Sequence, residues 1–365
     1  MRLDGYISAR QATLFIWFTI LPTAILFLPQ MLAKKSQQDA WLAIILAALP
    51  ALAVSACVYL LSRRFPRQTL WQMLEFILGR PLGRFFGFLY VWFFLHLNAV
   101  VVRQFGEFLT TAVMTETPLL VFAVTITAVS IYAARNGLEV LARAMEFIMP
   151  LMVFFMMAVL FLTAPEMSGR HLLPLMSRGW HPVLQGAFLA AGWLGEVVLL
   201  AAIVGFINPP EGLRSSILFG LAGTLFFLAA VTIGSIMIFG AAETGRLSFP
   251  AYSLARQVSI GEFLERIEVL FMAIWVGGVF IKITILLYVT ATGLGTLVGL
   301  TDYRPLLLPL GALTVALSVW LHEDVTHLTN YILRVWPSWS LIWEMFLPAL
   351  FLLLSLILDK KGEGA

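Results

Sequence analysis

Five ionisable side chains stand out inside long apolar runs of this sequence. They are Arg103, Glu107, Glu146, Glu196 and Lys282. A charge at the centre of a lipid bilayer costs at least ~2.5–3.5 kcal/mol, so charged residues at that depth face a partner or a water-filled cavity. If these runs cross a membrane, the five residues are candidates for charge pairs, gates or ion-binding positions.

His96, Arg103 and Glu107 are spaced seven and four residues apart. Residues at this spacing lie on one face of an α-helix, so the spacing predicts contact between Arg103 and Glu107. Two interpretations remain open. The arginine and glutamate form a self-sufficient pair near the outer interface, or they form a gate above a central pocket.

Lys282 stands in the apolar stretch VGGVFIKITILLYV, with no other charge within a helical turn. Its ammonium needs an acceptor, and the candidates are Glu196, Glu146 and backbone carbonyls freed at breaks in helices. One interpretation is a buried ion pair that only holds the protein together. The other is a fixed positive charge with a functional role, including a role in proton binding, because buried lysines titrate readily.

Glu196 and Glu146 can each also be explained by a purely structural role. Glu196 directly follows Gly195, so it can be a carboxylate at a helix end that local amides satisfy. Glu146 has Arg143 three residues before it, which makes a local pair an alternative to a place in a charge network.

The composition requires lipid as the solvent of this chain. Of 365 residues, 61% are hydrophobic and 12% are charged, and the mean hydropathy is +0.94. A soluble domain has roughly 25% charged residues. The composition therefore excludes a soluble enzyme, a nucleic-acid binder and a disordered scaffold.

Ten apolar segments approach or exceed the roughly 20 residues that a membrane-spanning helix needs. They are 11–33, 40–62, 83–112, 118–134, 143–163, 183–207, 214–241, 266–298, 304–321 and 340–358. We expect an all-α integral membrane protein with ten transmembrane helices in a single domain, 1–365. Lys and Arg favour the segments on the side of the N-terminus, which predicts that both termini are cytoplasmic.

The first and sixth segments carry matching helix breakers. Proline occurs at Pro22 and Pro29 in the first, and the sixth reads AAGWLGEVVLL. This favours a 5+5 inverted repeat, with repeats over about 8–163 and 183–358 and with helices 1 and 6 broken near the midplane. The alternative is that Pro and Gly are simply common in membrane helices. Broken helices expose backbone groups to a cavity, so we predict ligand-binding residues there: Pro22, Thr23, Ala24, Gly192, Trp193, Gly195 and Glu196.

The sequence gives no sign of an enzyme, a metal site or a cofactor. His322, Glu323 and His327 form H-E-x-x-x-H, one residue longer than the spacing that places two zinc-binding histidines on one helix face. No glycine-rich phosphate loop or Ser–His–Asp pattern occurs.

Several stretches resemble the B subunit of spore germinant receptors, a branch of the amino acid–polyamine–organocation superfamily. They include ISARQATLFIWF at the start, RNGLEVLARAMEF at 135–147, TDYRPLLLPLGAL at 301–313 and, most specifically, SFPAYSLARQVSIGEFLERIEVLFMAIWVGGVFIKI at 248–283. The resemblance implies a LeuT-like ten-helix fold in the spore inner membrane, partner A and C subunits, and a small nutrient ligand, usually an amino acid. This sequence departs from the glycine-rich first helix of such proteins, because it reads Leu21, Pro22, Thr23, Ala24.

Three functions are consistent with this scaffold. The first is a receptor subunit that binds a nutrient and signals to its partners. The second is a proton-coupled transporter of amino acids or amines, and the third is a pore for water or ions. Transporters of this superfamily often bind sodium between the first and eighth helices, so the resemblance implies that Lys282 replaces that cation.

Overall fold

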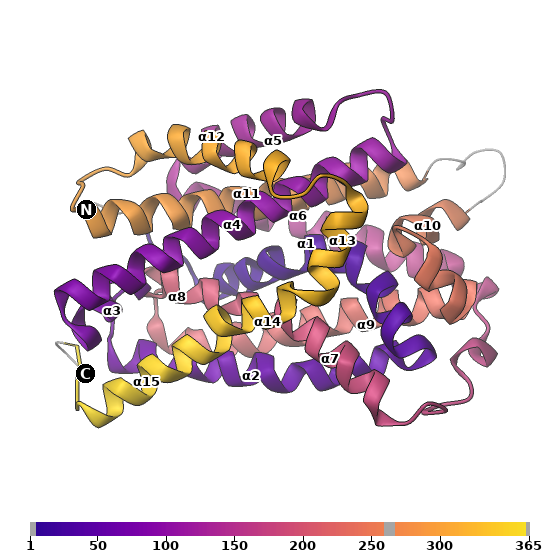
Figure 1. The fold of residues 1–365 in the computed structure, drawn as a ribbon, viewed down its shortest axis with the longest axis horizontal. Helices are drawn as coiled ribbons and strands as arrows, with labels where there is room; N and C mark the ends of the chain where they lie inside the picture. Colours follow the sequence, from indigo (N-terminus) through magenta and orange to yellow (C-terminus); the bar gives the residue numbers. More distant parts are fainter. Residues whose placement is uncertain (1–4, 259–266, 363–365) are drawn as a thin grey trace.

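The computed structural model describes residues 5–258 and 267–362, and over these ranges the chain is helical (Figure 1). The α-helices are α1 (Ala9–Ser36), α2 (Ala40–Arg64), α3 (Leu70–Leu78), α4 (Arg80–Ala112), α5 (Leu119–Ala134), α6 (Gly137–Thr163), α7 (Trp180–Leu194), α8 (Leu200–Ile203), α9 (Leu213–Arg246), α10 (Pro250–Gln257), α11 (Ile267–Val298), α12 (Arg304–Trp320), α13 (Val325–Arg334), α14 (Trp336–Leu341) and α15 (Leu347–Ile357). Short 3₁₀ and π segments connect some of them. The β pairing in the described part is one isolated bridge between Ile7 and Ile207.

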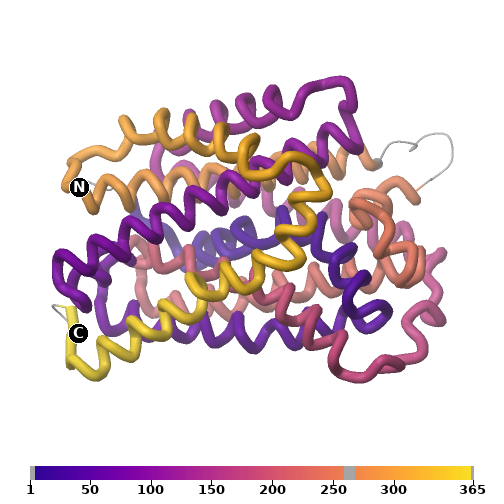
Figure 2. The backbone as a smooth tube through the Cα atoms, viewed as in Figure 1, coloured from indigo at the N-terminus to yellow at the C-terminus, as the bar shows by residue number. Residues whose placement is uncertain are grey.

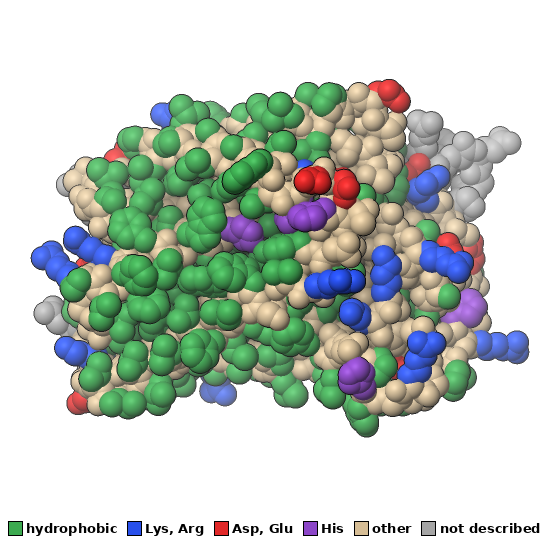
Figure 3. Space-filling view, viewed as in Figure 1, with side chains coloured by type: hydrophobic (Ala, Val, Ile, Leu, Met, Phe, Trp, Pro, Cys, Tyr) green, Lys and Arg blue, Asp and Glu red, His purple; other side chains and the backbone are tan. Residues whose placement is uncertain are grey.

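The chain is an integral membrane protein. Among the described residues, seven helical runs are long and apolar enough to cross a membrane, and an eighth is added if the bent pair α12 and α13 forms one span. One of these runs, Ala9–Arg64, contains both α1 and α2. Hydrophobic side chains cover the middle of the face in Figure 3, and Lys and Arg gather toward its ends. The count of ten spans and the inverted repeat stay predictions.

Two groups of helices enclose the centre of the protein. In one, which we call the first layer, α4, α5, α11 and α12 pack on one another; in the other, the second layer, α2 packs on α7, α9 and α15. The two layers occupy the upper and lower halves of Figure 1. Helix α1 lies between them, against α9 and α7 on one side and α11 and α6 on the other.

Burial identifies the central elements. The most apolar stretch of the run Trp180–Phe206 is 94% buried, whereas that of Gly137–Glu166 is 28% buried. Helix α1 is buried over nearly all of its length from Leu14 to Ala33. The first and sixth predicted segments therefore form the core, and the side chains of α6 are left largely for lipid.

Helix α1 is not broken, so the prediction of an interrupted first helix was wrong. It runs without interruption through both Pro22 and Pro29. A proline leaves unpaired backbone groups, but in membrane helices neighbouring side chains can satisfy them. The carbonyl that Pro22 leaves without its usual donor is that of Phe18, four residues earlier. A separate contact ties α1 to α11, because the indole Nε1 of Trp275 donates to the Pro22 carbonyl at 2.6 Å.

The sixth predicted segment is not unwound at its glycines; its helix type changes there from α to 3₁₀. Helix α7 ends at Leu194, and a 3₁₀ segment, η4, continues over Gly195–Leu199 into α8. The predicted break therefore falls at the right residue but takes another form. A 3₁₀ turn keeps a hydrogen bond for each carbonyl through i→i+3 pairing, so the chain avoids exposing backbone groups at membrane depth.

Two irregular features shape the last third of the chain. Helices α12 and α13 meet at an angle of 98°, a sharp turn visible in Figure 2. Between α14 and α15 the chain forms a π-helical segment, η8, over Ile342–Phe346. A π segment inserts an extra residue into a helical turn and is frequent at functional sites.

Both ends of the described chain lie at the same end of the bundle. The amide of Ile7 donates to the Phe206 carbonyl at 2.9 Å, and the amide of Gly362 donates to the Arg64 carbonyl at 3.0 Å. These two contacts are joined through the loop after α2, where Gly205 packs against the backbone of Arg67.

Candidate functional site

The centre of the protein holds a buried ion pair that joins the two layers. The Lys282 ammonium on α11 donates to Glu196 Oε2 at 2.6 Å and to Thr23 Oγ1 at 2.7 Å. Lys282 is completely buried, and Glu196 is 2% exposed. One short cluster therefore connects α1, η4 and α11.

The pair resolves the choice among the acceptors proposed for Lys282. Glu196 is the carboxylate partner, and Thr23 contributes a hydroxyl where a freed backbone carbonyl was expected. Glu146 is half-buried on α6, and its recorded partner is the Gln11 amide at 3.3 Å. Arg143 pairs with Glu139 rather than with Glu146.

The winding of η4 positions Glu196. Gly195 begins the 3₁₀ segment and has no side chain, so the carboxyl group of Glu344 lies directly against its backbone. A Cβ added at Gly195 would lie 2.3 Å from Glu344 Oε2. The glycine is therefore required for packing at this point rather than for an unwound loop.

Replacing Gly195 with alanine is expected to destabilise the protein by about 1–3 kcal/mol, because overpacking a core forces side chains out of place. Thermal unfolding in detergent measures this loss. Gly277→Ala on α11 is the matched control, since its nearest neighbour would be an ordinary contact at 3.8 Å. Equal thermal stability of the two variants would contradict the packing role of Gly195.

The other predicted ligand-binding residues are all in the core. Pro22, Thr23 and Ala24 are buried at the middle of α1, and Gly192 and Trp193 are buried near the end of α7. The carbonyl of Gly192 accepts a hydrogen bond from Trp336 Nε1 at 3.0 Å, which ties α7 to α14.

A small cavity lies beside the ion pair. Its volume is about 10 Å³, close to the ~10–15 Å³ that one water molecule needs. The lining residues are Leu97, Val100, Val101, Gln104, Trp193, Glu196, Ile332 and Trp336. Trp193 and Glu196 thus reach this cavity, and the predicted residues of α1 do not line it.

Sequence reasoning overlooked Glu344. This residue lies in η8 and is completely buried, and neither of its carboxyl oxygens has a hydrogen-bond partner among the described residues. Glu344 lies near the ion pair: its carboxyl group is against Gly195, the neighbour of Glu196, and the charges of Glu196 and Lys282 both act on it. A signal was present in the sequence, since Glu344 is the sole acidic residue of the predicted span 340–358.

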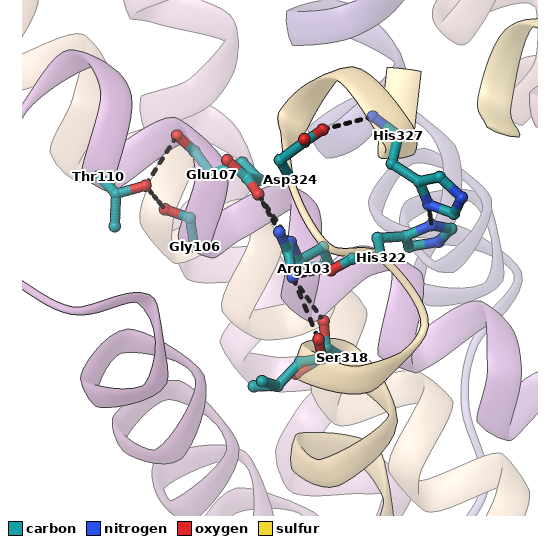
Figure 4. Close-up of polar contacts among 9 residues, drawn as sticks. Arg103, Gly106, Glu107, Thr110, Ser318, His322, Asp324 and His327 are labelled. Atoms are coloured by element: carbon teal, nitrogen blue, oxygen red, sulfur yellow. Dashed lines mark hydrogen bonds and ion pairs between the residues drawn. The ribbon is translucent and has the colours of Figure 1, made fainter. Parts of the chain in front are cut away.

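A second charge cluster lies where α12 turns into α13 (Figure 4). Arg103 and Glu107 on α4 form a buried salt bridge at 2.5 Å, as the i,i+4 spacing predicted. The guanidinium also donates to the carbonyls of Ser318, Val319 and His322. Arg103 therefore satisfies the free carbonyls at the end of α12 and braces the bend.

His96 lies on the same face of α4, two turns before Arg103 and three turns before Glu107. Its ring is 8% exposed, and its Nε2 lies 3.5 Å from the hydroxyl of Tyr331 on α13. The rings of Trp92 and Trp336 stack on it. The predicted group His96, Arg103 and Glu107 is thus one contact surface toward α12, α13 and α14.

Comparisons with known proteins identify a matching family and similar structures. The sequence profile of a family described as "Spore germination protein" matches residues 6–325. Spore germination protein KB of Bacillus subtilis (strain 168) is 29% identical over 359 residues, which are 97% of this chain and 95% of that protein. Two solved transporter structures also match.

Mhp1, a nucleobase-cation-symport-1 family transporter in a closed conformation with bromovinylhydantoin bound, has a TM-score of 0.69 at 13% identity, covering 96% of this chain and 78% of its own. MhsT in complex with L-phenylalanine has a TM-score of 0.64 at 12% identity, covering 97% of this chain and 99% of its own. The chain therefore shares the fold of LeuT-type transporters, as the sequence predicted.

Proposed function

The chain belongs to the family of spore germination proteins, and from this premise we propose that it is the membrane subunit of a germinant receptor. In this role it binds a small nutrient, an amino acid or a related molecule, between its two layers. Partner A and C subunits receive the resulting change of shape. The protein lies in the spore inner membrane with both termini cytoplasmic, in keeping with the shared end that Ile7 and Gly362 occupy.

The observation that carries this proposal is the ion pair between the layers. Lys282 belongs to the first layer, and Glu196 and Thr23 belong to elements packed with the second. A ligand that competes for either charged group separates the layers at their contact point. A ligand can shift a conformational equilibrium only through such a difference in contacts between two states.

The cavity beside the ion pair supplies the entrance for the ligand. The carboxylate of Glu196 and the amide of Gln104 line it, together with the indoles of Trp193 and Trp336. This lining suits a small molecule with an amino group and an apolar body. Because the present volume holds about one water, binding requires α13 and α14 to move away from α4.

Lys282 takes the place of a coupling cation in this proposal. Its ammonium stands between α1 and α11, where the resemblance implies a sodium site in related transporters. A tethered charge needs no ion gradient, which suits a receptor that must respond in a dormant cell.

Spores that carry this chain and its partner subunits as their sole receptor test the proposal. Trp193→Ala is expected to raise the nutrient concentration for half-maximal germination about tenfold or more, since a buried aromatic anchor carries much of a binding energy. Germination is followed as loss of spore refractility with an amino acid mixture as the trigger. Trp180→Ala is the control, because Trp180 is 60% exposed. Equal responses of both variants would refute the site.

A proton-coupled transporter is the second candidate, and the fold shared with Mhp1 and MhsT favours it. Purified protein in liposomes with an imposed pH gradient separates the two. Accumulation of a labelled amino acid that stops when the gradient is removed would establish transport. A receptor subunit is expected to bind the amino acid without accumulating it.

A further inference from the structure

Glu344 is the completely buried carboxyl group that the ion pair leaves without a partner. Neither Oε1 nor Oε2 has a hydrogen-bond donor among the described residues. The hydroxyl of Ser340, one turn earlier, is close enough to act on the carboxyl group, but its hydrogen bond goes to the Pro337 carbonyl. Among the described residues, only the Lys282 charge and the nearby Ser340 hydroxyl would favour a negative charge on Glu344, and both groups already have other partners.

Titratable side chains from three other elements lie near the Glu344 carboxyl group. From η4, Glu196 acts on Glu344 with a charge of the same sign, and from α11 Lys282 acts with the opposite sign. From α4, Tyr90 lies near, and its hydroxyl donates to the Trp343 carbonyl at 2.8 Å. The centre thus contains two carboxyl groups and one ammonium.

The ammonium is already engaged. The Lys282 ammonium lies 2.6 Å from Glu196 Oε2 and donates to both Glu196 and Thr23. A buried carboxyl group without a cation or donors is stable in its neutral form, because a charge in a low-dielectric interior is otherwise uncompensated. Two carboxylates beside one ammonium would also leave a net negative charge at membrane depth.

We propose that Glu344 is a proton-binding site, and that its proton exchanges with the opening of the Lys282–Glu196 pair. In the conformation described here Glu344 carries the proton. When the pair separates, the Lys282 ammonium turns to Glu344, whose O–H bond breaks. The electron pair stays on the carboxylate, and the proton passes to water that enters between the layers. Closing reverses the step, and Lys282 remains an ammonium throughout.

The backbone around Glu344 is irregular. The residue lies in a π segment, a form of helical turn that is frequent at functional sites. Gly195 leaves the carboxyl group in contact with the backbone that carries Glu196. The proton site is therefore joined to the layer contact, and the inference holds for a receptor subunit and a transporter alike.

Infrared spectroscopy of the purified protein tests this directly through the C=O stretching band of a protonated carboxyl group. At neutral pH the unmodified protein is expected to show the intensity of one such group, and Glu344→Gln is expected to lose it while folding normally. Glu107→Gln is the control, because Glu107 is paired with Arg103, and it should keep the band.

The Glu196→Gln variant provides a second, independent test of the proposal. Without the Glu196 charge, Lys282 turns to Glu344, so this variant is expected to lose the band although Glu344 is present. A band unchanged in Glu344→Gln would overturn the proposal, and so would a Glu344→Gln protein that fails to fold, since a neutral amide of the same shape replaces a neutral acid. A band retained in Glu196→Gln would overturn the coupling to the ion pair.

Discussion

Replacing Lys282 with methionine is expected to destabilise the protein by about 3–5 kcal/mol, because it leaves a buried carboxylate without its partner. Both side chains are almost completely removed from solvent, and they meet at 2.6 Å. The loss is measured as a lower midpoint of thermal unfolding in detergent.

The double variant Lys282→Met/Glu196→Met isolates the contribution of charge. Two apolar side chains of similar volume often replace a buried ion pair without loss of stability. We therefore expect the double variant to be more stable than Lys282→Met alone. Additive losses from the two single substitutions would show that packing, and not the ion pair, accounts for the effect.

The same variant separates a structural role of Lys282 from its proposed role as a substitute cation. If the ammonium replaces a coupling ion, the Lys282→Met protein that does fold should lose its germination response and regain part of it with added sodium. If the pair is only structural, sodium should have no effect. Sodium-stimulated amino acid binding by the unmodified protein would contradict the substitution.

Replacing Arg103 with leucine is the second change with a large expected effect, also about 3–5 kcal/mol. It leaves the Glu107 carboxylate unpaired, with side-chain exposures of 5% and 9% for the two residues. It also removes the donor to three carbonyls at the end of α12. The expected readout is early loss of folded protein on heating in detergent.

The double variant Arg103→Leu/Glu107→Gln should be no less stable than Arg103→Leu alone, because the uncompensated charge is gone. It should not reach the stability of the unmodified protein, since the carbonyls still lack their donor. Arg143→Leu is the control: Arg143 and Glu139 have the same i,i+4 spacing but are 70% and 46% exposed. Such an exposed pair contributes about 0–1 kcal/mol. A loss in Arg143→Leu as large as that in Arg103→Leu would show that burial is not the cause.

The sequence determined the features that depend on local composition and spacing. Continuous apolar runs can be satisfied in lipid only as helices, because every backbone group must find a partner within its own segment. The contact between Arg103 and Glu107 follows from one helical turn, so the spacing of four was sufficient to predict it. The need of Lys282 for an acceptor also followed from its apolar neighbours.

The backbone of the two central helices could not be predicted from their breakers. Pro22 stays within a continuous α1 that packs between the two layers, where Trp275, more than 250 residues away in the chain, donates to the Pro22 carbonyl. Gly195 tightens the helix rather than opening it because Glu344 occupies the space that a side chain would fill. Both outcomes depend on what another helix places beside the residue.

The partners at the centre of the protein were likewise decided by tertiary structure. Glu196, Glu146 and freed backbone carbonyls were all candidate acceptors for Lys282 on sequence. Only the tertiary structure brings Glu196 within 2.6 Å of the ammonium. Glu344 is a lone acidic residue in its apolar run, but only the fold places it beside that pair without a hydrogen-bond donor of its own. Apolar content and helical spacing are properties of one segment, whereas a charge in a membrane interior is defined by the groups that distant segments bring to it.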